Sequence, residues 1–198
     1  MTSLLSKWKH RDREIKETWS PYAKEYDPLK AGSIDGTDTE PHDRAVTRAI
    51  NSHYEPPHGL KSKPERTLFV SRFGPSVDKH DLKDLNPLLL MFFSKFGEVV
   101  STQVIYDVVT GHSMCYGFVE MRSEDDAWRI ARRLPDLNLM GHKIFVDFEV
   151  GRTMKGWKPR RLGGGFGGKK ESGQLRFGGK DRPFKKPFLL NVPQHMRD

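Results

Sequence analysis

The stretch Met114-Cys115-Tyr116-Gly117-Phe118-Val119-Glu120-Met121 decides how the rest of this chain is interpreted. Its alternation predicts a β-strand in which Tyr116 and Phe118 point to the same face of a sheet. Cys115, Gly117 and Val119 then point to the other face, where small and branched apolar groups suit a buried layer. We therefore expect the Cys115 thiol to be buried and inert. Two large rings on the open face of a soluble domain indicate a surface that binds something.

A second strand pattern lies upstream, at Thr67-Leu68-Phe69-Val70-Ser71-Arg72-Phe73, where Phe69 faces away from Leu68 and Val70. Together the two stretches resemble the RNA recognition motif (RRM), whose octamer runs Lys/Arg-Gly-Phe/Tyr-Gly/Ala-Phe-Val-x-Phe/Tyr. Positions three to six match at residues 116–119, whereas Met114, Cys115 and Met121 depart from positions one, two and eight. In RRMs the aromatic side chains of these two strands stack on unpaired bases.

The resemblance implies an α+β fold, the ferredoxin-like βαββαβ RRM with a four-stranded antiparallel sheet and two helices, flanked by extended N- and C-terminal arms. We expect three segments in the chain. Residues 1–63 are an N-terminal extension with a short helix near 42–54, residues 64–150 are the RRM, and residues 151–198 are a basic, glycine-rich C-terminal arm.

Periodicity and capping signals place the remaining elements. For the first RRM helix we expect Asn86 as N-cap, Pro87 at the first helical position and a buried stripe of Leu88, Met91, Phe92 and Phe96. Residues 78–85 lengthen this segment, so a broken or two-part helix is expected. Strands are predicted at about 99–107, with Val104 inward and Gln103 and Ile105 outward, and at 143–149.

Two further helices follow from the same signals. Ser123 and Asp126 form a predicted capping box for the second RRM helix, whose sheet-facing residues are Ala127, Ile130, Ala131 and Leu134. The short helix of the N-terminal extension has an apolar face made of Ala45, Val46, Ala49, Ile50 and Tyr54.

Charge is distributed unevenly along the chain. When Lys and Arg are counted as positive and Asp and Glu as negative, the net charges are +1 for residues 1–63, −3 for 64–150 and +10 for 151–198. Because attraction to phosphates depends on the cations brought to the backbone, we expect the C-terminal arm to supply the electrostatics and the sheet to supply stacking. In the arm, basic residues surround Trp157, which is typical of an RNA-contacting segment. A solvated flexible tail is the alternative.

Catalysis and cofactor binding find little support. Gly163 to Lys169 has the G-x-x-x-x-G-K spacing of a P-loop, but Lys170 stands where Ser or Thr must bind Mg²⁺. The same run matches a dinucleotide fingerprint, but no strand precedes it. No catalytic triad or metal-ligand spacing is present, so we predict no enzyme activity, no cofactor and no metal. A single cysteine excludes an intrachain disulfide and fits a reducing compartment, and no apolar run suits a membrane span.

The join between the RRM and the arm carries a more specific resemblance. Gly151-Arg152-Thr153, Lys155-Gly156-Trp157 and Pro159-Arg160-Arg161-Leu162-Gly163-Gly164-Gly165 resemble the seventy-kilodalton protein of the major spliceosome's first small nuclear ribonucleoprotein (snRNP). Residues 22–38 and 167–179 are similar to the minor-spliceosome counterparts of that protein, the 35 kDa snRNP proteins. This resemblance implies an RNA-binding component of a spliceosomal snRNP, located in the nucleus, that binds the minor-class small nuclear RNA (snRNA) recognising 5′ splice sites. Other snRNP proteins are expected partners through both arms, and no membrane is.

The candidate RNA-binding residues are the outward side chains of the sheet and the cations and ring of the arm: Phe69, Tyr116, Phe118, Gln103, Phe145, Arg72, Arg152, Lys155, Trp157, Lys158, Arg160 and Arg161. Two alternatives stay open. An RRM-like domain can serve as a protein-interaction module through its helical side, or the chain can bind messenger RNA in general. Retention of all three rings favours RNA over the first alternative, and the arm favours an snRNP over the second.

Overall fold

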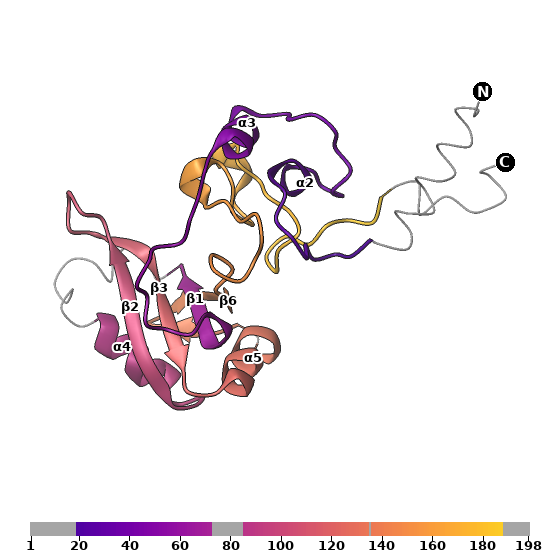
Figure 1. Ribbon diagram of the computed structural model, residues 1–198. Helices are drawn as coiled ribbons and strands as arrows, with labels where there is room; N and C mark the ends of the chain where they lie inside the picture. The colour runs from indigo at the N-terminus through magenta and orange to yellow at the C-terminus, as the bar shows by residue number, and fades with distance from the viewer. Residues whose placement is uncertain (1–18, 73–84, 135, 188–198) are drawn as a thin grey trace, which may run out of the picture. The chain divides into compact units, whose positions relative to one another are not determined.

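The computed structural model describes residues 19–72, 85–134 and 136–187, and the chain divides into two compact units (Figure 1). One unit spans residues 56–153. The other combines residues 1–55 with residues 154–198. The sequence patterns predict two separate arms, whereas the structure joins the described residues of both flanks in one unit. The reason is that each flank supplies half of a shared interior.

The unit of residues 56–153 has the predicted RRM architecture. Its antiparallel sheet has the order β2-β3-β1-β6, formed by β1 (Thr67–Ser71), β2 (Val99–Tyr106), β3 (Ser113–Met121) and β6 (Phe145–Phe148). A 3-10 turn, η1 (Pro64–Arg66), leads into β1, and a small hairpin, β4 (Asn138–Leu139) and β5 (His142–Lys143), precedes β6. The last strand is therefore shorter than the predicted 143–149.

Helices α4 (Leu85–Phe93) and α5 (Glu124–Arg133) cover one face of this sheet (Figure 1). The inward residues of the strands meet the helices in a single apolar core that includes Leu68, Val70, Val104, Val119 and Ile130. Val104 is buried and Gln103 is exposed, as the alternation of β2 predicts. The opposite face of the sheet carries no helix of the described part of this unit.

The first RRM helix differs from the prediction. Asn86 lies inside α4 instead of capping it, and its side-chain carbonyl accepts a hydrogen bond from the Val104 amide at 2.9 Å. The helix is therefore rotated relative to the expected stripe: Leu89 and Phe93 are fully buried, whereas Met91 is 64% exposed. Leu88, Phe92 and Phe96 pack against the core as predicted. The predicted break falls at residues 78–85 and lies largely outside the described residues.

Helix α5 follows its sequence signals closely. The Ser123 side chain caps it by accepting from the Asp125 amide, and Ala127, Ile130 and Ala131 are buried. The capping-box role of Asp126 is not what the structure shows, because its carboxylate accepts a hydrogen bond from the Arg129 guanidinium at 2.7 Å. The cap and the apolar stripe of this helix are confirmed.

Cys115 is not where simple alternation places it. The pairing of β2 with β3 shifts register between Val104 and Tyr106, and Cys115 adopts a positive φ of 58°. Such a bulge interrupts the alternation of inward and outward residues, so Cys115 is only half-buried. The prediction of a fully buried thiol is therefore wrong, while the placement of Tyr116, Gly117 and Phe118 is right.

The second unit is held together by the pairing of N-terminal with C-terminal backbone. It contains α2 (Pro28–Gly32) and α3 (Arg44–Asn51) from the first flank, and the 3-10 turns η3 (Arg160–Leu162) and η4 (Lys170–Ser172) from the second. Amide–carbonyl bonds join Phe177 to Ala31 at 2.7 Å and Tyr26 to Lys155 at 2.8 Å. The C-terminal segment, orange to yellow in Figure 1, accordingly runs beside the two short helices.

Two side chains from opposite flanks form the interior of this unit. Tyr26 is 5% exposed, packs edge-on against Trp157 and Phe166 and donates its hydroxyl to the Gly165 carbonyl at 2.9 Å. Burial raises the pKa of Tyr26, so the phenol stays neutral. The Arg176 guanidinium is fully buried and donates to both carboxylate oxygens of Asp43, at 3.0 and 3.2 Å.

The short N-terminal helix agrees with its prediction in part. Val46 and Ala49 of α3 are fully buried, but Ile50 is 45% exposed and Tyr54 lies beyond the end of the helix. Asp43 caps α3 by accepting from the Val46 amide at 2.6 Å. Among the described residues, no helix has the length and apolar character needed to cross a membrane.

Candidate nucleic-acid interface

Three aromatic rings lie side by side on the open face of the RRM sheet. Phe69 of β1 is directly opposite Phe118 of β3 in the strand register, and their ring centroids are 5.9 Å apart. Tyr116 lies 5.7 Å from Phe69 and 6.3 Å from Phe118. All three side chains are partly exposed. The strand register thus brings together the two halves of the aromatic pattern, which are 47 positions apart at Phe69 and Tyr116.

The predicted neighbours of these rings flank them on both sides. Gln103 of β2 pairs in register with Phe118 and is exposed. At the other side, Phe145 begins β6 opposite Ser71, and the Arg72 guanidinium lies 5.0 Å from the centre of the Phe145 ring. Arg72 has a positive φ of 70°, and its amide donates to the Cys115 carbonyl at 3.0 Å. Six of the predicted residues, Arg72 among them, therefore share one surface.

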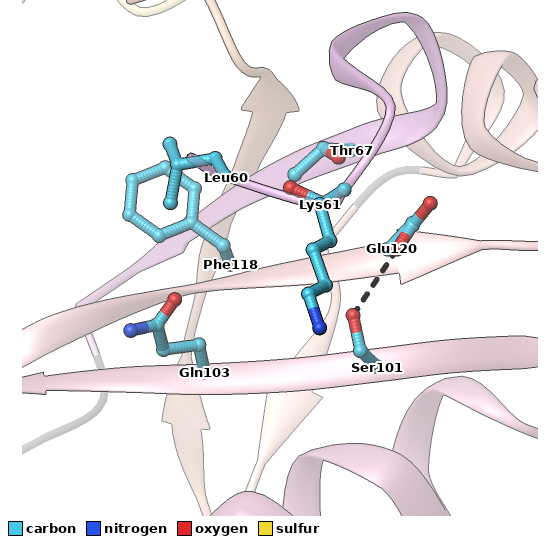
Figure 2. Close-up of a pocket in the computed structure, with 8 residues that line it drawn as sticks. Leu60, Lys61, Thr67, Ser101, Gln103, Phe118 and Glu120 are labelled. Atoms are coloured by element: carbon cyan, nitrogen blue, oxygen red, sulfur yellow. Dashed lines mark hydrogen bonds between the residues drawn. The ribbon is translucent and has the colours of Figure 1, made fainter. Parts of the chain in front are cut away.

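The segment before η1 also borders this surface. The sequence patterns did not predict this contribution. Leu60, Lys61 and Ser62 line a pocket together with the β2 residues Ser101 and Gln103. Figure 2 shows Lys61 reaching across the strands beside Ser101, with Gln103 and Phe118 close by. No motif marks residues 60–62; they follow Pro56-Pro57-His58-Gly59 and read as a linker.

Glu120 is the charged group at the base of this pocket. Its carboxylate accepts from the Lys63 amide at 3.1 Å, from the Arg66 guanidinium at 2.9 and 3.0 Å, and from the Ser101 hydroxyl at 3.2 Å. Burial acts to raise the pKa of Glu120, but these hydrogen bonds outweigh it and lower the pKa below its usual range. The carboxylate is therefore ionised at neutral pH, and three of its four hydrogen bonds are accepted by one oxygen, Oε1.

The predicted RNA-contacting residues of the C-terminal segment have partners within the protein. Arg152 belongs to the RRM unit and donates to the Glu149 carboxylate at 2.6 Å and to Ser62. In the second unit, Lys155 is 3.3 Å from Glu25, and Lys158 donates to the Ser52 carbonyl at 2.5 Å. Trp157 packs against Tyr26 and Phe166.

The two adjacent arginines of η3 differ in their surroundings. Arg160 donates to the carbonyl groups of Gln174 and Phe166, at 2.8 and 2.7 Å, and so holds the glycine-rich segment. Arg161 is exposed, with its guanidinium 5.8 Å from the centre of the Tyr54 ring. Gly163 and Gly168 have positive φ, and a Cβ at either would meet a backbone carbonyl oxygen. These glycines allow close packing of the chain on itself.

Comparisons with known proteins agree with this geometry. The family model described as the RNA recognition motif matches residues 68–144. The U11/U12 small nuclear ribonucleoprotein 35 kDa protein of Xenopus laevis is 51% identical over 177 residues, which cover 89% of this chain and 62% of the frog protein. Its zebrafish (Danio rerio) counterpart is 51% identical over 174 residues, 88% of this chain and 80% of the relative.

The relation to the major-spliceosome protein is more distant. The U1 small nuclear ribonucleoprotein 70 kDa homolog of Schizosaccharomyces pombe is 34% identical over 128 residues, which cover 64% of this chain and 46% of the yeast protein. The 35 kDa proteins are matched at higher identity and over both flanks as well as the RRM. The chain therefore belongs to the family of U11/U12 small nuclear ribonucleoprotein 35 kDa proteins.

Proposed function

We propose that this chain binds single-stranded snRNA of the minor-class snRNP that recognises 5′ splice sites, and does so in the nucleus as a component of that particle. The observation that carries the proposal is the group of Phe69, Tyr116 and Phe118 on neighbouring strands of an open sheet face. Rings at this spacing offer stacking surfaces to successive unpaired bases. Membership of a family whose proteins are named for the U11/U12 snRNP supports the particular RNA.

Stacking rather than net charge is expected to dominate binding by the RRM unit. Residues 56–153 contain thirteen Lys and Arg and thirteen Asp and Glu, so the unit is neutral overall. Gln103, Arg72 and Phe145 then contribute hydrogen bonds, one cation and a further ring at the edge of the stacked bases. A neutral surface gives little long-range attraction for phosphates, so the cations that attract RNA are expected in the flanks.

We assign the residues of the C-terminal segment two different roles. Arg161 and Lys155, which are exposed, contact phosphate oxygens, and Lys155 exchanges its solvent-exposed ion pair with Glu25 for a phosphate. Arg152, Lys158, Arg160 and Trp157 hold the chain in the conformation that presents them, because each already binds a carboxylate, a carbonyl or a ring cluster. We further propose that other snRNP proteins bind the unit formed by the two flanks.

Truncation of the rings tests the proposal. One base–ring stack is worth about 1–3 kcal/mol, so Phe118→Ala should weaken binding of the cognate RNA by roughly 5- to 100-fold. The RNA is identified first by crosslinking in cells and sequencing of the bound fragments. Affinity is then measured for the wild type, for Phe118→Ala and for Phe69→Ala/Phe118→Ala.

Two outcomes would contradict the proposal. A folded Phe69→Ala/Phe118→Ala protein that binds RNA like the wild type would exclude the open sheet face as the site. Crosslinked RNA drawn evenly from messenger RNAs, with no snRNA enriched, would favour general messenger-RNA binding. The matched control is Trp128→Ala, because Trp128 is an exposed ring on the helical side of the same unit and should leave RNA affinity unchanged.

A further inference from the structure

The second helix of the RRM unit carries a tryptophan that the fold does not bury. Ala127, Ile130 and Ala131 form the face of α5 that packs on the sheet, whereas Trp128 is 47% exposed. Helix α5 covers the face of the sheet opposite the open one (Figure 1), so Trp128 lies away from the three stacking rings. Tryptophan and arginine are enriched among the side chains that dominate protein–protein binding. The surface around Trp128 is therefore a candidate for protein binding.

Two arginines at the end of α5 lie over aromatic rings. The Arg133 guanidinium is 4.9 Å from the centre of the Trp128 ring, and the Arg132 guanidinium is 5.1 Å from the centre of the Phe148 ring. Asp147 lies 3.7 Å from Arg132 and partly balances its charge. A guanidinium held over a ring loses less freedom when it binds a ligand, because its planar fork of N–H groups is already oriented. Both side chains are therefore prepared to bind a planar acceptor such as a carboxylate.

The charge around Trp128 is positive and only partly balanced. Residues 127–133 contain three arginines and no acidic residue. Arg129 is paired with Asp126 at 2.7 Å. Arg133 is exposed, and among the described residues no carboxylate forms an ion pair with it. The cation beside Trp128 can therefore bind a carboxylate of another molecule without breaking an ion pair of the described chain.

An acidic peptide fits these features better than RNA does. Glu124 and Asp125 are exposed at the start of the same helix, and their negative charges repel a phosphate backbone that runs along it. A peptide can place carboxylates at Arg132 and Arg133 and an apolar side chain against the Trp128 ring without reaching that acidic end. The surface therefore matches a segment in which acidic residues flank a large apolar one.

We propose that the C-terminal half of α5 is a docking surface for an acidic segment of a partner protein. Arg133 binds a carboxylate of that segment through two N–H groups, Arg132 adds a second cation, and the Trp128 ring covers an apolar side chain of the same segment. This docking goes beyond the proposed RNA function, because it uses the face of the RRM unit opposite the stacking rings. The open sheet can therefore hold RNA while the helical side holds a protein.

The experiment uses the purified full chain and a display library of random short peptides. Selection should enrich peptides that carry several acidic residues and at least one large apolar residue. The most enriched peptide is synthesised with a fluorescent label, and its affinity is measured by anisotropy. Trp128→Ala should weaken its binding by roughly 5- to 30-fold, the range of a side chain that dominates an interface. Arg133→Gln should weaken it by roughly 3- to 10-fold, between the effects of an exposed ion pair and of a charged hydrogen bond.

Further variants separate the site from general effects. Arg133→Lys keeps the charge and loses the planar fork, so it should recover only part of the affinity that Arg133→Gln loses. Met91→Ala removes an exposed apolar side chain of α4, and Arg122→Gln removes an exposed guanidinium that is paired with Glu98; both should bind the peptide like the wild type. Thermal unfolding of each variant checks that it is folded. If Trp128→Ala is destabilised, Arg133→Gln is the deciding variant, because Arg133 lies exposed at the last position of the helix.

The outcomes also separate this inference from the proposed function. Selection of no acidic peptides, or unchanged peptide affinity in Arg133→Gln, overturns the docking surface. Displacement of the peptide by single-stranded RNA, together with weaker RNA binding by Arg133→Gln, overturns it as well and makes these arginines phosphate contacts. Phe69→Ala/Phe118→Ala should lose RNA binding and keep the peptide, whereas Arg133→Gln should lose peptide affinity and keep RNA binding. If the double variant binds RNA like the wild type, the proposed function fails and the docking surface stands.

Discussion

At the scale of single residues, the β3 strand shows how backbone conformation overrides side-chain chemistry. Gly117 is buried between β1 and β2, and a Cβ there would lie 2.5 Å from the Gln103 carbonyl oxygen. Cys115, two residues earlier, occupies the position where the RRM octamer has Gly and adopts a φ of 58°. Residues with a Cβ are strained in this region. Cys115 therefore holds a backbone conformation that glycine would adopt without this strain.

The strain at Cys115 leads to a prediction about stability. Cys115→Gly should raise the free energy of unfolding of the RRM unit by about 0.5–1 kcal/mol, because relief of the left-handed conformation exceeds the entropy cost of glycine. Cys115→Ala is the matched variant, since it removes the thiol and keeps the Cβ, and it should stay close to the wild type. Urea unfolding of the three proteins measures the difference. Equal stability of the Gly and Ala variants would contradict the strain.

At the scale of elements, α3 depends on a partner from the far end of the chain. It has eight residues, too few for a helix to be stable alone in water. Asp43 caps its N-terminus and also accepts from the buried Arg176 guanidinium. One carboxylate therefore both starts the helix and fixes the C-terminal segment against it.

Removal of the Asp43 carboxylate should destabilise the second unit strongly. Asp43→Ala leaves the buried Arg176 charge without its carboxylate, which costs about 3–5 kcal/mol, in addition to about 1 kcal/mol for the cap. Asp43→Asn keeps a capping oxygen and loses the charge, so it should cost less than Asp43→Ala. Hydrogen exchange of the α3 amides measures both effects. Asp107→Ala, in the exposed β2–β3 turn, is the control and should leave α3 protection unchanged.

The same pair predicts how stability depends on pH. Burial acts to raise the pKa of Asp43, but hydrogen bonds from Arg176 and from the Val46 amide outweigh it, so the folded-state pKa lies below 3.8. A depressed carboxyl pKa stabilises the fold above the unfolded-state pKa, and this contribution is lost as pH falls through the folded-state value. Protection of α3 should therefore fall below about pH 4 in the wild type. In Asp43→Asn the pH dependence should be weaker.

At the scale of the whole molecule, charge and aromatic surface are carried by different units. Residues 56–153 are neutral, so the net +8 of the chain comes from the unit built by the two flanks. That unit is not a loose tail, because Tyr26, Trp157, Phe166 and Arg176 form a common interior. Removal of the C-terminal flank would thus remove cations and also half of a folded unit.

Truncation should reveal this dependence. In a chain ending at Thr153, the α3 amides are expected to exchange rapidly with solvent, because Asp43 and Tyr26 have lost their partners. The amides of β1 and β3 should keep most of their protection, since their hydrogen bonds lie within residues 56–153. Hydrogen exchange read by mass spectrometry distinguishes the two regions. Unchanged protection of α3 would show that the N-terminal flank folds without the C-terminal one.

A charge substitution is therefore a cleaner test of phosphate contacts than truncation. Arg161→Gln should flatten the log–log dependence of RNA affinity on salt by about 0.7–0.9. Arg133→Gln is the matched control, because its guanidinium also lies over an exposed ring, at 4.9 Å from the centre of Trp128, on the helical side of the RRM unit. Its slope should equal that of the wild type. If RNA affinity depends on salt with the same slope in all three proteins, Arg161 does not contact RNA phosphates.

The sequence by itself determined the RRM fold and the open-face rings. The alternation in residues 67–71 and 116–119 fixes which side chains face the helices, because a strand has a period of two. It also determined the cap at Ser123 and the buried face of α5, which depend on contacts a few residues apart. These features are local, and local patterns carry their own geometry.

Only the tertiary structure decided what depends on distant contacts. Asn86 does not cap α4, because its side-chain carbonyl accepts a hydrogen bond from the amide of Val104, eighteen positions away. Cys115 is displaced by a register shift that the pairing of two strands creates. Residues 60–62 line the sheet because Arg152, about ninety positions on, holds them there. The two flanks form one unit because the Arg176 charge can be buried only against a carboxylate, and Asp43 at the other end of the chain supplies it.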